Sequence, residues 1–345
     1  MKELTLSSLD VVWERLRGSY PPEGPDWGRF FSARWERANF ASRYHLVYPG
    51  LACYARIRRH PETAAEMRPL LDVIYQGLIS EQCWAFWHAE MEETSGAIAE
   101  RNLTYAGRLA MFVGLYIDAF GEPPAATVDV DGDSITYSEL SARLWQQMTE
   151  SPSCGVSCYH HEAMVMCNAV LLINNLLHDR LFGTSYAVSN DQWLHTVRDH
   201  LVADPSIGPL FFYGTVADSP EPNTEKVSLG MDAWALALMS ATAPAEVAGW
   251  FDSWRHHLQD DGDAIWVPIS EGQERIEDST TELATAWVLV LAAELGDTDL
   301  HDRIDNHLAP RAVTGFRVDP YISGLYALGH ELQPGGLRRL VTEPA

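Results

Sequence analysis

The residues best suited to chemistry gather in one short stretch of the chain, between positions 154 and 167. This stretch holds three thiols, two imidazoles, a phenol and a carboxyl: Cys154, Cys158, Tyr159, His160, His161, Glu162 and Cys167. Such groups exchange protons when their surroundings bring their pKa values toward the working pH. A helix N-terminus lowers the pKa of a nearby thiol, so Cys158 is expected to be partly ionised. The stretch therefore predicts proton transfer on a small molecule.

Zinc binding is the alternative interpretation of these cysteines and histidines. The spacing of the cysteines, C-x3-C-x8-C, matches no compact structural zinc motif. The chain also has no glycine-rich phosphate loop and no HExxH or GxSxG motif. We therefore expect free thiols, no bound metal and no cofactor.

The stretch leads into a helix, expected over residues 163–182, that is apolar on almost every side. A helix of this kind must be covered by protein on almost every side. The reactive residues are thus expected at the N-terminal mouth of a deeply buried helix.

Strongly apolar helices alternate along the chain with charged amphipathic ones, and glycine or proline separates many of them. The apolar helices are expected at residues 43–59, 102–120, 162–182, 228–241, 280–295 and 320–332. The amphipathic helices are expected at residues 62–79, 136–150, 190–203, 245–258 and 298–308, with a sixth at the N-terminus. This alternation predicts an all-α fold, an (α/α)6 barrel in which six inner helices are wrapped by six outer ones. An open helical solenoid would show fewer helices that are apolar all round.

The barrel is expected to form a single domain, residues 1–345, because no linker or low-complexity segment interrupts it. Three β-prone pieces, residues 126–137, 210–216 and 264–269, are expected to form small hairpins at the rim.

If the inner helices share one mouth, their first turns bring the candidate site residues together. The acid and base candidates are Tyr159, His161, Glu162 and Asp232, with Arg108 to orient the substrate or stabilise charge and Cys158 and Cys167 to line the site. The candidates for substrate binding are Tyr44, His45, Tyr105, His160, Trp234 and Glu282. A proton donor must be neutral before it acts, which favours a buried carboxyl such as Glu162, expected at the start of the helix one turn from Tyr159.

The chain is acidic, with 24 basic against 48 acidic residues and a net charge of −24. This balance argues against nucleic acid and anionic membranes as partners, because both require clustered Lys and Arg. The N-terminus does not resemble a signal peptide, and the longest apolar run, residues 283–293, is too short to span a bilayer. A cytoplasmic protein without membrane insertion is expected.

Several motifs resemble those of the linalool dehydratase-isomerase family. They are the Gly-hydrophobic-x-Cys loop at residues 155–158, a second cysteine nine residues later followed by Asn168, and DRLFGTSY at residues 179–186. The segments NLTYAGRL at residues 102–109, GLY at 114–116 and the tail over 283–310 are also similar. The resemblance covers roughly residues 40–310 in order.

The resemblance implies an (α/α)6 barrel, a ring-shaped homo-oligomer, and the addition or removal of water or the shift of a double bond on a monoterpene alcohol without a cofactor. It implies places in the site for both Cys158 and Cys167. At three positions where the family has functional residues, this chain differs: Tyr159 replaces an acidic residue, Arg108 a histidine and Gly230 a tyrosine. The resemblance therefore implies the same scaffold with an altered reaction.

We therefore expect a cofactor-independent acid/base lyase, isomerase or cyclase, acting on an apolar alkenyl substrate of terpenoid or polyketide type in specialised metabolism. The alternative is a carbohydrate-active barrel enzyme (a glycosidase, unsaturated-uronate hydrolase or sugar epimerase), with Asp232, Asp278 and Glu282 as acids and Trp234 and Trp287 against the sugar. A non-catalytic helical scaffold is the third possibility. The character of the site separates the first two, since a sugar site should be wet and acidic and a terpenoid site dry and aromatic.

Overall fold

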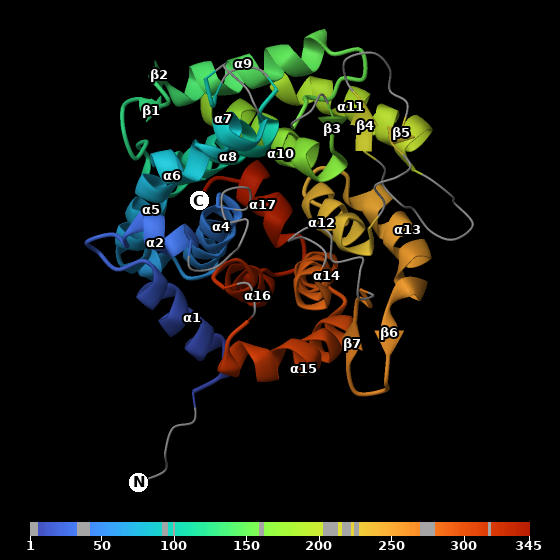
Figure 1. Cartoon of the computed structure of the whole chain (residues 1–345). Helices are drawn as coiled ribbons and strands as arrows, with labels where there is room; N and C mark the ends of the chain where they lie inside the picture. The colour runs from blue at the N-terminus through green and yellow to red at the C-terminus, as the bar shows by residue number, and fades with distance from the viewer. Residues whose placement is uncertain are drawn as a thin grey trace.

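The computed structural model describes residues 6–32, 42–91, 96–98, 101–158, 162–202, 213–215, 222–223, 228–269, 280–316 and 319–345. In these residues six inner helices form a closed ring (Figure 1). They are α4 (Tyr44–Arg59), α8 (Leu103–Phe120), α10 (Val165–Phe182), α12 (Leu229–Met239), α14 (Thr281–Leu295) and α16 (Tyr321–Glu331). Each packs against the next in this order, and α16 packs against α4 to close the ring.

An outer layer of amphipathic helices surrounds this ring (Figure 1). It consists of α1 (Ser8–Ser19), α5 (Ala64–Ile79), α9 (Tyr137–Glu150), α11 (Asn190–Thr196), α13 (Pro244–Trp254) and α15 (Thr298–Thr314). Inner and outer helices alternate along the chain, so the expected (α/α)6 barrel is confirmed. The inner helices are buried around most of their circumference, as their apolar sequences predict.

The inner helices end where the sequence places its stops. After α10 and α14, Gly183 and Gly296 adopt left-handed conformations with φ of 70° and 74°. Glycine takes this conformation without steric cost and so terminates a helix. The shorter helical segments are α2 (Trp27–Ser32), η1 (Pro61–Thr63), α6 (Glu81–Trp84), α7 (Phe86–Met91), η2 (Tyr186–Ser189), the π-helix η3 (Val197–Leu201) and η4 (Arg255–His257).

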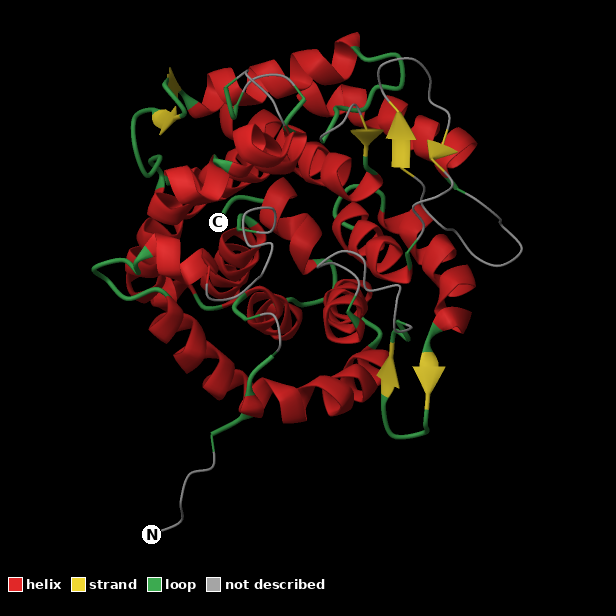
Figure 2. Cartoon of the chain, in the orientation of Figure 1, coloured by secondary structure: helices red, strands yellow, loops and turns green. Residues whose placement is uncertain are grey.

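Small antiparallel strand pairs lie among the helices (Figure 2). The strand β1 (Val128–Val130) pairs with β2 (Asp133–Ile135), and β6 (Gln259–Asp260) pairs with β7 (Ile265–Trp266). A third sheet has the order β3 (Glu162–Ala163), β4 (Tyr213–Thr215), β5 (Pro222–Asn223). The three segments expected to form hairpins contain β1, β2, β4 and β7. The strand β3 lies where the sequence predicts the first residues of helix α10.

A short last helix, α17 (Gly336–Thr342), lies inside the ring of inner helices (Figure 1). It packs against α4, α10 and α14. The buried carboxylate of Glu294 accepts hydrogen bonds from the backbone N–H groups of Leu337 and Arg338, at 2.6 and 3.0 Å. The Nε of Arg180 donates to the carbonyl of Val341 at 3.0 Å. Because Glu294 and Arg180 lie near the C-terminal ends of α14 and α10, α17 is fixed at that end of the barrel.

None of the helices in the described residues is both long enough and apolar enough to cross a bilayer.

Candidate active site

The N-terminal turns of the inner helices meet at one end of the barrel. The hydroxyl of Tyr44, the first residue of α4, lies 3.3 Å from the hydroxyl of Thr104 in the first turn of α8. Its ring lies 5.1 Å from that of Trp234 on α12 and 5.5 Å from that of Tyr321 on α16. Arg108 on α8 contacts Cys167 in the first turn of α10. Because these contacts join residues near the N-termini of α4, α8, α10, α12 and α16, these helices run in the same direction and share one mouth.

Five buried aromatic residues, which we call the aromatic cluster, pack beneath this mouth: Tyr44, Tyr48, Trp234, Trp287 and Tyr321. The two indoles stack at 5.5 Å and 14°, and Tyr48 stacks on Tyr321 at 5.0 Å and 13°. Tyr48 also meets Trp287 edge to face at 4.8 Å. Aromatic packing of this density excludes water and makes the interior beneath the mouth apolar.

Arg108 is fully buried against the aromatic cluster. Its guanidinium carbon lies 4.7 Å from the centre of the Tyr44 ring and 5.1 Å from that of Trp234. One Nη donates to the carbonyl of Thr104 at 2.9 Å, and both Nη atoms approach the sulfur of Cys167, at 3.7 and 3.8 Å. An arginine side chain keeps its positive charge even when buried, so it places a fixed charge beside this thiol.

Cys158 and Cys167 are both fully buried and interact through their thiols. Burial opposes the ionisation of Cys167, but the hydrogen bond with Cys158 and the positive charge of Arg108 outweigh it and lower its pKa to about 6. Burial and the neighbouring Cys167 sulfur raise the pKa of Cys158 well above the usual range. The pair thus combines a thiolate and a thiol, the ionised and the protonated form of one functional group.

The expectation that Cys158 is the partly ionised thiol is wrong. The helix begins at Val165, so Cys167 lies in its first turn and Cys158 lies in the preceding loop. Cys167 is also the thiol that the Arg108 guanidinium contacts. The favourable effect of the helix N-terminus and the charge therefore falls on Cys167.

Asn168 holds the loop that carries Cys158. Its side chain accepts from the backbone N–H of Val156 at 2.8 Å and donates to the carbonyls of Val156 and Met164 at 3.1 and 3.0 Å. On the same loop, a Cβ atom at Gly155 would lie 2.3 Å from the ring of Trp193. The Gly-hydrophobic-x-Cys spacing is thus explained by close packing of the loop, and the Cys-Asn pair by its bracing.

Glu162 is buried but does not open the helix. It belongs to β3, where it pairs with Thr215, and its carbonyl accepts from the backbone N–H of Cys158 at 2.8 Å. The expectation that Tyr159 and Glu162 lie on one face of a helix is therefore wrong, because Glu162 is not helical. Tyr159, His160 and His161 lie outside the described residues.

The other candidates divide between the mouth and the outer layer. Tyr44 and Trp234 belong to the aromatic cluster, and the ring of His45 lies 6.1 Å from that of Tyr321. Tyr105 turns its hydroxyl toward α5, where it donates to the carbonyl of Leu78 at 2.7 Å. Asp232 is fully buried and accepts from the indole N–H of Trp254 on the outer helix α13, at 3.3 Å. Glu282 forms an ion pair with Arg311 of α15 at 2.8 Å.

Arg43 and Tyr48 contact the candidate site residues but are not among the residues that the sequence predicts. Tyr48 follows Tyr44 by four residues, a spacing that places both on one face of α4 and could have revealed it. Arg43 precedes the helix, and its Nη2 donates to the hydroxyls of Tyr44 and Thr104 at 2.8 and 2.7 Å. No spacing pattern identifies Arg43, because its partners come from the tertiary structure.

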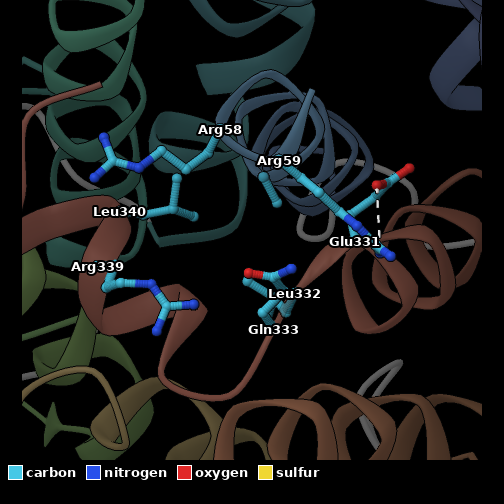
Figure 3. A pocket seen from close by; sticks show the side chains of 9 residues that line it. Arg58, Arg59, Glu331, Leu332, Gln333, Arg339 and Leu340 are labelled. Atoms are coloured by element: carbon cyan, nitrogen blue, oxygen red, sulfur yellow. Dashed lines mark ion pairs between the residues drawn. The ribbon is translucent and has the colours of Figure 1, made fainter. Parts of the chain in front are cut away.

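A pocket of about 100 Å³ lies at the other end of the barrel (Figure 3). Arg58, Arg59 and Arg339 line it, but Arg59 and Arg339 donate to the carbonyls of His330 and Pro334, at 2.6 and 2.5 Å, and Arg58 donates to that of Pro344. Arginines near helix C-termini commonly satisfy such carbonyls. The pocket lies at the opposite end of α4 from Tyr44, about 20 Å away at 1.5 Å per residue. It is therefore separate from the candidate site.

Within the described ranges, no three His, Cys, Asp or Glu side chains come together as metal ligands. The donor groups at the mouth are a thiol pair, two guanidinium groups, phenols and indoles. Groups of these types can transfer protons and stabilise charge.

The barrel is similar to a solved structure, an inactive variant of the alpha-1,6-mannanase GH76A of Salegentibacter sp. HEL1_6 in complex with alpha-1,6-mannotriose. The identity is 12%, the TM-score is 0.55, and the match covers 94% of this chain and 98% of that one. At this identity the likeness supports the fold alone. The family model described as linalool dehydratase/isomerase matches residues 43–317, which include both cysteines and five of the six inner helices, all but α16. The chain therefore belongs to the linalool dehydratase/isomerase family.

Proposed function

We propose that the protein is a cofactor-independent acid/base enzyme, a lyase, isomerase or cyclase, that acts on an apolar alkenyl substrate of terpenoid or polyketide type. The observation that carries the proposal is the buried Cys158–Cys167 pair beside Arg108 and the aromatic cluster. Family membership supports an enzyme of the dehydratase or isomerase kind.

The thiol pair supports proton transfer in both directions. Cys167, with its pKa lowered to about 6, is a base at neutral pH, and Cys158, with its pKa raised, is an acid. Removing a proton from one carbon and adding one to another shifts a double bond. Adding one to an alkene can start ring closure, and loss of water needs a proton on the leaving hydroxyl. Glu162 and the residues 159–161 remain further candidates for these steps.

The surroundings of the pair support an apolar substrate. The aromatic cluster is buried, and the indoles of Trp234 and Trp287 stack on each other. Among the described residues at the mouth, Asp232 is engaged with Trp254, and Glu282 with Arg311. These two carboxylates are therefore not paired with each other as a glycosidase needs, which favours the terpenoid-like substrate over a sugar. Asp278, the third acid of the alternative, lies outside the described residues.

Solvent deuterium tests the proposal. The purified protein, treated with a chelator, is incubated in deuterium oxide with linalool, geraniol and related alkenyl alcohols, and the compounds are analysed by mass spectrometry. We expect a rearranged, dehydrated or cyclised product, which carries deuterium at carbon where the reaction protonates an alkene, whereas simple loss of water places none there. The matched pair of variants is Cys167→Ala, which should abolish product formation, and Cys53→Ala, a buried cysteine on α4 outside the site, which should retain it.

Incubation with alpha-1,6-mannotriose provides the opposite arm. Cleavage of the mannotriose, without exchange into any alkenyl compound, would refute the proposal in favour of a carbohydrate-active enzyme.

A further inference from the structure

Arg108 is a buried cation that lacks a carboxylate partner in the described part of the chain. Its polar contacts among the described residues are the Thr104 carbonyl, the sulfur of Cys167 at 3.7 and 3.8 Å, and the Tyr48 hydroxyl, and its Nε–H group has no hydrogen-bond partner among them. A fully buried guanidinium normally has a close anion that satisfies its planar array of donors. A single sulfur at these distances leaves most of that capacity unused.

The residues around Arg108 have unused hydrogen-bond donors as well. The indole N–H groups of Trp234 and Trp287 are buried without a hydrogen-bond partner in the described residues, and the Tyr48 hydroxyl has beside it only the Arg108 guanidinium, itself a donor. These side chains contact one another, and Arg108 lies over the Trp234 ring. Buried donors are rarely left without an acceptor, and two of these groups, the indoles, can only donate. The cluster therefore lacks an acceptor, and a group rich in oxygen lone pairs would supply it.

A second buried cation adds to the positive charge at this place. Arg43 is fully buried, and its Nε and Nη2 donate to the hydroxyl of Thr104, the residue whose carbonyl binds Arg108. Its guanidinium carbon lies 4.3 Å from the centre of the Tyr44 ring, which Arg108 also contacts. Because an arginine keeps its charge when buried, the positive charge at Arg108 is permanent.

We propose that Arg108 and the surrounding donors of Tyr48, Trp234 and Trp287 bind the carboxylate of an alkenoic acid substrate, whose hydrocarbon chain packs on the aromatic cluster. This inference rests on the proposed function and specifies its substrate class. A carboxylate is planar and carries one charge, which matches one guanidinium fork. A diphosphate carries more negative charge than the two buried guanidinium groups of Arg43 and Arg108 supply.

Two ligands with the same carbon chain test the inference. Geranic acid and geraniol differ in having a carboxyl or a hydroxymethyl group, and the acid is fully ionised at about pH 8. Dissociation constants are measured by calorimetry on the intact protein. We expect the acid to bind at least tenfold more tightly than the alcohol, and also more tightly than geranyl diphosphate.

The variant Arg108→Gln should lose this preference, so that acid and alcohol bind within about threefold of each other. Arg108→Lys, which retains the charge but not the fork, should keep part of it. The matched control is Arg68→Gln, on the outer helix α5, where Arg68 pairs with Glu122 at 2.5 Å. It should bind both ligands like the wild type. If Arg108→Gln does not fold, the wild-type preference alone decides the inference.

The outcomes separate this inference from the proposed function. Tighter binding of the alcohol or the diphosphate, equal binding of all three ligands, or binding of none of them, would overturn the carboxylate subsite. Deuterium incorporation into the alcohols in the same case would leave the proposed function standing. Selective binding of the acid without any deuterium exchange would support the subsite and refute the acid/base function.

Discussion

At the scale of single residues, the site depends on which of two cysteines carries the charge. The sequence singles out the two cysteines that the structure brings into contact, because both cysteines, the following asparagine and the spacing of nine are visible in it. It does not predict the ionised member. That depends on the position of the Arg108 guanidinium, 59 residues earlier in the chain than Cys167, and on the true start of α10. Such contacts arise only when the ring of helices closes.

The ionisation of Cys167 can be measured by the ultraviolet absorbance of the thiolate as a function of pH. We expect one thiolate to form with a pKa of about 6 in the folded protein. Arg108→Gln removes the positive charge that favours the thiolate, so the pKa should rise, and Arg68→Gln should leave it unchanged. The same titration midpoint in Arg108→Gln and the wild type would contradict this account of the thiolate.

Glu162→Gln tests the buried carboxyl of β3 as a proton donor. The substitution preserves size, so the protein should fold, and kcat should fall by on the order of a hundredfold or more if the carboxyl donates the proton. Turnover of the substrate found by deuterium exchange provides the measurement. Glu246→Gln, on the outer helix α13, is the control and should retain activity. Normal turnover in Glu162→Gln would exclude Glu162 and leave Cys158, Tyr159 and His161 as donors.

At the scale of elements, the inner helices follow their expected ranges closely. Apolar residues on all sides and a glycine stop define such a helix locally, as in α14, which ends before Gly296. The strand β3 could not be predicted in this way, since it consists of Glu162 and Ala163 and pairs with Thr215 and Gly214. A two-residue strand has no periodicity of its own, and its partner lies about 50 residues away. The error in the position of Glu162 follows from this.

Two glycine-to-alanine substitutions test the packing of the inner ring. A Cβ atom at Gly324 of α16 would lie 2.5 Å from the backbone nitrogen of Pro49 on α4, so Gly324→Ala must separate these helices. We expect it to lower the free energy of unfolding by about 1–3 kcal/mol. At Gly249 of α13 nothing lies within 4 Å, and Gly249→Ala should raise it by about 0.5–1 kcal/mol. Denaturant titration measures both, and equal effects of the two substitutions would contradict the close approach of α4 and α16.

At the scale of the whole molecule, the sequence predicts the barrel because its alternation of apolar and amphipathic helices extends from α1 to α16. The order of inner helices around the ring is the order in the chain, so each helix packs against its sequence neighbours. Because of this order, the first turns of the inner helices meet at one mouth, and the buried Arg43 and Arg108 come together there. The single domain, the ring-shaped oligomer and the cytoplasmic location stay predictions.

The number of reactive thiols and the amount of bound zinc test the expectation that the protein works without a metal. All five cysteines are free thiols in the structure. We expect five thiols to react with a thiol reagent after denaturation under non-reducing conditions, and less than one equivalent of zinc by atomic emission. Stoichiometric zinc that survives dialysis would instead make the segment from Cys154 to Cys167 a metal site.

The helix α17 has a consequence for kinetics. It lies among the inner helices at the end away from the aromatic cluster, where Glu294 and Arg180 bind its backbone. We therefore expect α17 to close the far end to a substrate that enters at the mouth, so that the product leaves by the entrance. Entering and leaving molecules then compete for one passage. Added product should inhibit the enzyme in competition with substrate. With large substrates, slow release of the product should limit turnover, while the chemical step before it is fast.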